Sequence, residues 1–299
     1  MPELPEVETT VKGLIKKVLL RTFIDVWSDW ESVVKKPKDF EVFKKQIKGK
    51  KIIKVWRRAK NVIFDLSEGS SLLMHQKMTG HLLYGNWVFK NKAWTPENPG
   101  PLNDPYNRFI HLVFFLDDKK MIALSDARKF AKAELWKSGD LKKELEKFGP
   151  EPLEDGFTFK KFKEALKGKS LFGARSLGRR GKVKQVIMDP FVIAGIGNIY
   201  SSEALWQAKI HPIKDVSKLK DRELKKLFSA IKKVLTLGVK LGGESFSDYR
   251  KPDGSKGNFD TERRVYKREG QKCRRCGGII RRLKVGQRSA FYCPSCQRP

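Results

Sequence analysis

The sequence predicts an α+β protein of two main domains: an antiparallel β-sandwich with a helix at its N-terminus, and a helical C-terminal domain that ends in a cysteine-bearing β-hairpin. Three observations predict this class. Between about residues 24 and 136 the chain consists of short alternating or apolar runs, between 158 and 240 apolar residues recur with helical spacing, and all four cysteines lie in the last 27 residues. At 299 residues, two domains are the expected number.

The first predicted element is a helix. Val7, Val11, Leu14 and Val18 recur at i, i+4, i+7 and i+11, which places them on one helical face. Pro5 suits a first helical turn, and the acidic residues at positions 6 and 8 suit the positive end of the helix dipole. The runs that follow are typical of strands in an antiparallel sandwich or barrel; examples are residues 51–57, 61–66, 71–74, 109–116 and 121–124.

Turn residues divide the rest of the chain. Residues 86–108 contain four prolines and are interpreted as a long loop, and Gly149-Pro150-Glu151-Pro152 is interpreted as a linker. Beyond the linker, apolar spacing predicts helices, for example over 221–237. The predicted divisions are 1–148 for the sandwich, 149–153 for the linker, 154–244 for the helical domain, and 245–299 for a glycine-rich loop with the cysteine hairpin.

The charge predicts a polyanionic partner. Sixty-four Lys and Arg residues face 34 Asp and Glu residues, which gives a formal charge of +30. Release of counterions from phosphates would supply much of the affinity for nucleic acid, although charge alone also allows RNA or a membrane surface. No apolar run approaches the roughly 20 residues that span a bilayer, and the acidic N-terminus has no signal-peptide pattern. A cytoplasmic, nucleoid-associated protein is therefore expected.

The cysteines predict a metal site. Cys273, Cys276, Cys293 and Cys296 form two Cys-x2-Cys pairs with sixteen residues between them. Zinc binds four thiolates tetrahedrally, and each pair presents two sulfurs on one side of a turn. Disulfides are the alternative, which a reducing cytosol disfavours. Because four protein ligands leave no position for water, one structural Zn²⁺ is predicted.

The N-terminus predicts covalent chemistry. A small residue after the initiator methionine normally allows its removal, so the mature chain is expected to begin at Pro2, beside Glu3 and Glu6. An α-amino group has a pKa of about 8, so part of it is unprotonated near neutrality. A secondary amine that attacks the anomeric carbon of a sugar forms an iminium ion. A disordered tail that happens to begin Pro-Glu is the alternative interpretation.

Four stretches together resemble the formamidopyrimidine-DNA glycosylases. Residues 2–9 (PELPEVET) match the opening of that family, 195–200 (GIGNIY) the turn of its helix–two-turns–helix motif, 242–259 its lesion-capping loop, and the terminal cysteines its zinc finger. The resemblance follows one order through nearly the whole chain. It implies a bifunctional base-excision enzyme that flips an oxidised base from double-stranded DNA, cleaves its glycosidic bond and nicks the strand as an AP lyase.

The resemblance also implies catalytic roles. Pro2 corresponds to the nucleophile, Glu3 to the acid/base that helps to open the sugar, and Glu6 to a residue that supports the site electrostatically. Lys60 corresponds to a lysine that contacts the phosphate beside the lesion. These residue types suit the chemistry, because an iminium at Pro2 acidifies the adjacent sugar protons for β- and then δ-elimination.

Seven further residues are implied in DNA binding. A flipped base leaves a void in the stack, and apolar or planar side chains fill it. Met78, Arg128 and Phe130 match the family's void-filling residues, although alanines at 127 and 131 replace its usual proline and glycine. Matches to phosphate-binding residues are Asn198 at a predicted helix N-terminus, Arg288 between the cysteine pairs, and, with weaker motif support, Lys184 and His75.

The predicted function is therefore a monomeric DNA glycosylase and AP lyase for 8-oxoguanine and formamidopyrimidines. A close alternative is the sister group, the endonuclease VIII-like enzymes for oxidised pyrimidines, which more often have glycine at the position of Leu4. A non-catalytic zinc-ribbon DNA-binding protein is the alternative from another class. It would account for the charge and the cysteines but not for Pro2, Glu3 and Lys60.

Overall fold

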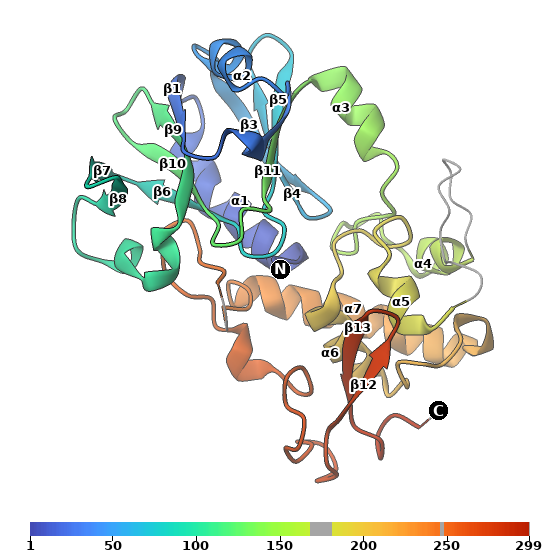
Figure 1. Ribbon diagram of the computed structural model, residues 1–299. Helices are drawn as coiled ribbons and strands as arrows, with labels where there is room; N and C mark the ends of the chain where they lie inside the picture. The colour runs from blue at the N-terminus through green and yellow to red at the C-terminus, as the bar shows by residue number, and fades with distance from the viewer. Residues whose placement is uncertain (168–180, 246–247, 299) are drawn as a thin grey trace. The chain divides into compact units, whose positions relative to one another are not determined.

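The computed structural model describes residues 1–167, 181–245 and 248–298, which form two compact units (Figure 1). The first unit comprises Met1–Glu144 and Leu241–Asp260, and the second comprises Leu145–Lys240 and Thr261–Pro299. Within the described ranges, no helix is both long enough and apolar enough to cross a membrane. Residues 168–180, part of the predicted helical stretch, and residues 246–247 of the predicted capping loop lie outside the described residues.

The first unit contains the predicted sandwich. One sheet has the order β1 (Phe23–Ser28), β9 (Ile110–Leu116), β10 (Met121–Ser125), β6 (His81–Gly85) and is antiparallel throughout. The other has the order β2 (Val34–Lys36), β11 (Lys132–Lys137), β5 (Ser70–His75), β4 (Asn61–Leu66), β3 (Ile52–Arg58), with only β2 and β11 parallel. Inward side chains of both sheets, such as Phe64 and Phe114, share one apolar core.

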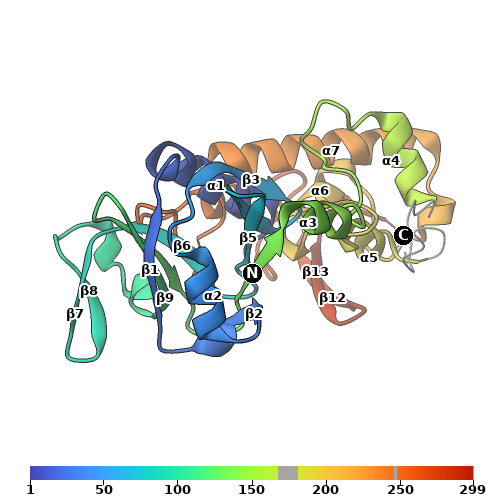
Figure 2. The ribbon, with the colours of Figure 1, turned by 90° about the horizontal axis from the view of Figure 1, so that it is seen from above.

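Helix α1 (Leu4–Val18) carries the predicted apolar face. Its four predicted residues, Val7 to Val18, are buried in the sandwich core, and the helix contacts β3 and β4 of one sheet and β6 of the other (Figures 1 and 2). Burial of this face fixes the helix on the sandwich. Helix α2 (Phe40–Ile47) packs against β1 and β2, and α3 (Ser138–Leu145) follows β11.

The interpretation of residues 86–108 as a long loop is wrong. They form a hairpin, β7 (Trp87–Lys90) and β8 (Ala93–Pro96), followed by two 3-10 turns, η2 (Pro101–Asn103) and η3 (Pro105–Arg108) (Figure 2). Trp94 packs against Trp27 and Phe115, whose ring centroids lie 5.3 and 5.9 Å from its own. The hairpin therefore forms because its aromatic side chains find partners on β1 and β9, while the prolines mark the ends of short elements.

The second unit is helical and ends in a hairpin. Its helices are α4 (Phe159–Leu166), α5 (Val183–Met188), α6 (Asn198–Ala208) and α7 (Asp221–Lys240), with the 3-10 turn η4 (Val216–Lys218) before α7. Helix α6 packs against α5, α7 and the terminal hairpin of β12 (Arg281–Val285) and β13 (Arg288–Tyr292). The predicted helix over 221–237 is confirmed, and it extends to Lys240.

The compact units do not follow the predicted division at residues 244 and 245. That division groups residues 245–260 with the cysteine hairpin, whereas Leu241–Asp260 packs into the first unit. The main-chain N–H of Tyr84 donates to Pro252 O at 2.8 Å, and Pro252 lies against Gly13 of α1, where an added Cβ would be 2.9 Å from Pro252 Cγ. The glycine-rich segment therefore returns to α1 and β6 before the chain enters the second unit again at Thr261.

Candidate active site and nucleic-acid interface

The N-terminal end of α1 brings Pro2, Glu3 and Glu6 together in a buried position. Glu3 and Glu6 are only 2% and 1% exposed, and Pro2 is buried as well. The main-chain N–H of Glu3 donates to Glu6 Oε2 at 2.7 Å, which closes the first helical turn. Two carboxyl groups therefore lie beside the chain terminus at the positive end of the helix dipole.

The surroundings of the terminal amine favour its neutral form. In the chain that includes Met1, burial lowers the pKa of this amine, against the negative charges of Glu3, Glu6 and Asp248, which raise it; Lys60 lowers it further. Lys60 comes from the two-residue turn between β3 and β4, where Ala59 takes a φ of 52°. A nucleophilic amine needs an unprotonated lone pair, so an environment that lowers the pKa of an amine suits covalent chemistry.

The returning segment 241–260 covers the carboxyl group of Glu6. Glu244 N–H donates to Glu6 Oε1 at 2.8 Å, and Tyr249 O–H donates to the main-chain oxygen of Glu6 at 3.0 Å. Gly243 has a φ of 84°, and a Cβ added there would lie 2.9 Å from Glu6 Oε1. Glycine is therefore required at 243 for both conformation and close approach. Burial raises the pKa of Tyr249, which keeps its phenol protonated and able to donate.

Met78, Arg128 and Phe130 lie on two loops that one buried carboxylate holds together. Asp126 is fully buried, and its carboxylate accepts from the N–H groups of Phe130 and Ala131, both at 2.8 Å, and from the hydroxyl of Thr79 next to Met78. The Arg128 guanidinium lies over the Phe130 ring at 4.6 Å, and Phe130 is 50% exposed. The structure thus brings the three predicted void-filling residues onto adjacent loops, with Arg128 and Phe130 exposed and Met78 partly buried.

His75 ends β5 with its ring partly buried. Its Nδ1 accepts from the N–H of Lys77 at 2.9 Å. Burial, with the nearby charges of Lys77, Lys132 and Lys60, lowers the pKa of His75 to about 3. The imidazole is therefore neutral at physiological pH, so it can offer a phosphate an N–H donor but no positive charge.

Asn198 and Arg288 line one pocket in the second unit. The pocket has a volume of about 460 Å³, and its other lining residues include Lys267, Arg282 and Glu269, whose Oε2 lies 3.1 Å from Arg282 Nε. Asn198 is the first residue of α6, and among the described residues its buried Oδ1 has no hydrogen-bond partner. The positive dipole end of a helix and basic side chains suit an anion, so the pocket brings together two of the predicted phosphate-binding residues at a place chemically suited to phosphate.

Lys184 is buried, whereas the sequence predicted that it contacts a phosphate. It is 1% exposed, and its Nζ donates to Ser202 Oγ at 2.8 Å, Ser201 Oγ at 2.9 Å and Asn198 O at 3.2 Å. A lysine amino group has at most three donors, and these contacts use them inside the protein. Lys184 therefore fixes the start of α6, and with it Asn198, from within.

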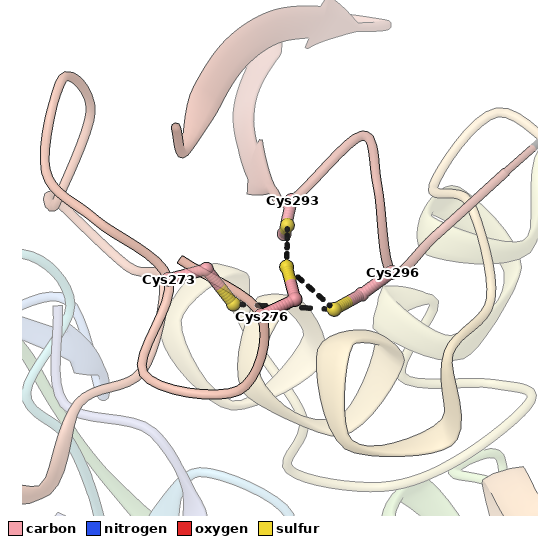
Figure 3. Close-up of side chains that lie close together, drawn as sticks. All are labelled: Cys273, Cys276, Cys293 and Cys296. Carbon is pink, nitrogen blue, oxygen red and sulfur yellow. Dashed lines mark hydrogen bonds between the residues drawn. The ribbon is translucent and has the colours of Figure 1, made fainter. Parts of the chain in front are cut away.

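The four cysteines converge in the second unit (Figure 3). Their sulfurs lie within 4.8 Å of one another, with Cys276 Sγ 3.4 Å from Cys293 Sγ and 3.3 Å from Cys296 Sγ. Thiolates about 2.3 Å from zinc in a tetrahedron are about 3.8 Å apart, so the cluster fits this ion. Trp206 Nε1 of α6 donates to Cys273 Sγ at 3.4 Å, a contact that orients the ligand.

Sequence reasoning assigned no role to Asp126 or Glu203. An Asp before an exposed turn is a recognisable signal for side-chain bonds to the following N–H groups, which Asp126 makes. Glu203 accepts from the N–H groups of Arg264, Val265 and Tyr266 at 2.9, 3.0 and 2.8 Å, and so attaches the segment before the cysteines to α6. No local sequence pattern predicts this contact, because the partners of Glu203 lie about sixty positions further along the chain.

Comparison with known proteins matches nearly the whole chain to one family. Residues 1–133 match the formamidopyrimidine-DNA glycosylase N-terminal domain, 148–250 the formamidopyrimidine-DNA glycosylase H2TH domain, and 270–299 the zinc finger found in FPG and IleRS. The formamidopyrimidine-DNA glycosylase of Desulforamulus reducens is 34% identical over 303 residues, which cover 100% of this chain and 99% of the relative.

Solved structures agree in fold along the same length. Wild-type Lactococcus lactis Fpg (MutM) bound to DNA that contains N7-benzyl-Fapy-dG has a TM-score of 0.83 and 31% identity, with 100% of both chains covered. A MutM complex with DNA that contains carbocyclic 8-oxo-G has a TM-score of 0.82 and 31% identity, again with 100% of both chains covered.

These matches account for the main features of both units. The sandwich with its buried Pro2–Glu3–Glu6 terminus corresponds to the first matched domain, and α5 to α7 lie within the second. The cysteine cluster lies within the matched zinc finger and holds one structural Zn²⁺. With three consecutive domain matches and relatives at more than 30% identity over its full length, the chain belongs to the formamidopyrimidine-DNA glycosylase family.

Proposed function

We propose that this chain is a bifunctional DNA glycosylase and AP lyase that excises 8-oxoguanine and formamidopyrimidines from double-stranded DNA. The single observation that carries the proposal is the position of Pro2, which is buried beside Glu3 and Glu6 at the start of α1. Membership of the family and the damaged DNA in the complexes of its solved relatives support the same conclusion. The charge of +30 suits a DNA partner.

The proposed mechanism begins at Pro2 after Met1 is removed. The proline nitrogen attacks C1′ of the flipped nucleotide, the N-glycosidic bond breaks, and the base leaves with a proton. Glu3 supplies or accepts protons as the sugar ring opens and the iminium forms. Loss of a C2′ proton expels the 3′ phosphate, and a second elimination expels the 5′ phosphate. Lys60 stabilises the charge on the departing phosphate, and Glu6 holds the first turn of the helix.

DNA engagement is divided between the two units. Met78, Arg128 and Phe130 fill the void that the flipped base leaves, with Arg128 able to hydrogen-bond the orphaned base. Asn198 and Arg288 bind backbone phosphates in their common pocket, while Lys184 acts indirectly by fixing Asn198. His75 donates one neutral hydrogen bond. The structural zinc supports the hairpin that carries Arg288. The enzyme is proposed to act as a monomer in the nucleoid-containing cytoplasm.

The second candidate is excision of oxidised pyrimidines by the same nucleophile. The test is borohydride trapping on two duplexes, one with 8-oxoguanine opposite cytosine and the other with dihydrouracil. A covalent adduct on the first duplex that maps to Pro2 is the expected result. An adduct on the second duplex alone would show that the substrates are oxidised pyrimidines, and the proposed mechanism would still hold.

Variants separate the nucleophile from the fold. Pro2→Gly and a form that retains Met1 should both lose strand nicking while lesion binding persists. Pro5→Ala, in the same helical turn, is the matched control and should nick normally. Absence of any adduct from folded protein with Met1 removed would leave a DNA-binding protein and overturn the enzyme proposal.

A further inference from the structure

The 3-10 turns η2 and η3 lie against the returning segment 241–260 of the same unit. Gly254 has a φ of 84°, and a Cβ added there would lie 2.6 Å from Pro101 O. Asn107 is 1% exposed, and its Nδ2 donates to Gly254 O at 3.2 Å and to Pro101 O at 3.0 Å. The end of the 86–108 segment is therefore packed so closely onto the returning segment that their main chains are in contact.

An ion pair between a buried arginine and a partly exposed aspartate also links the two segments. Arg250 is 1% exposed, and its Nε lies 3.0 Å from Oδ2 of Asp104, which begins η3. The Tyr106 ring covers the guanidinium at 4.6 Å from its centroid. Asp104 is held in turn, because its Oδ1 accepts from the N–H of Tyr106 at 3.0 Å. Burial of the Arg250 guanidinium costs desolvation that the attraction of the pair only partly offsets, so the pair is weak evidence for stability.

Short contacts lead from this pair to the proposed catalytic terminus. Arg250 Nη1 donates to the main-chain oxygen of Tyr249 at 2.8 Å, and the Tyr249 hydroxyl donates to Glu6 O at 3.0 Å. The same segment supplies the Glu244 N–H that binds the Glu6 carboxylate, and Asp248, whose charge acts on the terminal amine. Asp248 and Tyr249, which directly precede Arg250 in the chain, are thus attached through Arg250 to Asp104.

We propose that the Asp104–Arg250 ion pair is a positioning device for Glu6 and the terminal amine. The inference rests on the proposed function and assigns a role to the 86–108 segment, whose sequence predicted none. An apolar residue at 250 would fill the same space but would not fix the direction of the chain at 248 and 249. Neither Asp104 nor Arg250 is proposed to touch DNA.

The test compares Asp104→Asn, Arg250→Gln and the double variant in the full-length protein with Met1 removed. The measurement is the single-turnover rate of borohydride-trappable imine formation at saturating enzyme on a duplex with a preformed abasic site, well below each melting temperature. Each single variant should slow this rate on the order of tenfold, as displacement of reacting groups does. The double variant should be no slower than the slower single one, because the pair acts as a unit.

Two further readouts distinguish positioning from general damage to the fold. In the chain with Met1, burial is the largest influence on the pKa of the terminal amine, ahead of the charges of Glu3, Glu6, Lys60 and Asp248. Water admitted by the displacement should therefore raise the pKa of the amine and move the acid limb of the rate profile to higher pH. Affinity for undamaged duplex should be unchanged. Asp25→Asn, which breaks the partly exposed Asp25–Lys44 pair between β1 and α2, is the matched control and should match the wild type in rate and profile.

The outcomes separate this inference from the proposed function. A wild-type protein that forms no adduct refutes the proposed function, whereas variants that trap as fast as an active wild type refute only the positioning role. If Asp104→Asn does not fold, Asp104→Glu, which keeps the charge but displaces the carboxylate, is measured in its place. A wild-type rate and pH profile in that variant together with folded Arg250→Gln would overturn the proposal.

Discussion

The carboxylate of Glu6 accepts a hydrogen bond of 2.8 Å from the main-chain N–H of Glu244, a residue 238 positions further along the chain. Its other oxygen accepts from the N–H of Glu3 at 2.7 Å. A single side chain therefore joins the first turn of α1 to the segment that returns from the second unit. An ionised carboxylate suits this role because both of its oxygens accept.

We expect Glu6→Gln to destabilise the first unit by about 3 kcal/mol, because an amide NH₂ then faces one of two buried N–H donors and a charge-assisted bond is lost. Chemical denaturation measures this change. The same substitution at Glu41, exposed in the first turn of α2, is the matched control and should change stability by no more than about 0.5 kcal/mol. Equal stability of Glu6→Gln and wild type would show that the Glu3 and Glu244 contacts contribute nothing.

Local patterns in the sequence predicted those elements whose determinants are local. The valine and leucine face of α1 and the apolar run of β4 are periodic over fewer than twenty residues, and the structure has both. The cysteine spacing predicted the metal cluster for the same reason. These features depend on neighbours along the chain, which the sequence displays directly.

The features that the sequence did not predict depend on distant partners. The β7–β8 hairpin needs Trp94 to meet Phe115, and the return of segment 241–260 needs Glu244 to meet Glu6. Burial is equally hidden, since Lys184 is one of 64 basic residues and nothing beside it in sequence indicates that it faces inward. Resemblance located the proposed site residues, and the structure shows which of them are held inside the protein.

Lys184→Met tests the inward role of this lysine. The variant removes the donor to Asn198 O, Ser201 Oγ and Ser202 Oγ, and we expect a loss of about 2 kcal/mol in unfolding free energy together with weaker DNA binding. Lys182→Met, two residues earlier and exposed, is the matched control for stability. A stable variant with normal affinity would contradict the role assigned to Lys184. A variant that is stable but binds DNA more weakly would indicate that Lys184 contacts a phosphate, as the sequence predicted.

Removal of the metal should separate binding from chemistry. Cys293→Ser breaks the tetrahedral set, so zinc content should fall and duplex affinity should weaken as the β12–β13 hairpin loses its anchor. The imine-forming rate at saturating enzyme should persist, because the proposed nucleophile belongs to the other unit. Metal analysis, titration and trapping measure the three quantities. Ser295→Ala, exposed between the last two cysteines, should keep its zinc. Unchanged affinity in zinc-free protein would refute the prediction.

The salt dependence of DNA affinity should show whether Arg288 binds a phosphate. If it contacts one phosphate, Arg288→Gln lowers affinity for all duplexes alike and reduces the slope of log affinity against log salt by about 1. Arg281→Gln removes an equally exposed arginine from β12, outside the pocket, and should leave the slope unchanged. Titrations at several salt concentrations distinguish the two variants. The same slope for both would remove Arg288 from the proposed phosphate site.

Acid should destabilise the protein partly through His75. Its pKa is about 3 in the folded protein and about 6.5 in an unfolded chain, so below pH 6.5 the unfolded state alone takes up the proton. The contribution of neutral His75 to the free energy of unfolding is complete above pH 6.5 and is lost as the pH falls toward 3. The loss is about 2 kcal/mol between pH 7.5 and 5. His75→Asn keeps an acceptor for the Lys77 N–H but does not titrate. We therefore expect its unfolding free energy to fall less than that of the wild type over this interval.

The remaining fall belongs partly to His81 and His211, because burial lowers the pKa of each of these imidazoles as well. An identical pH dependence in variant and wild type would mean that His75 is protonated in the folded state, and it would then offer DNA a charge.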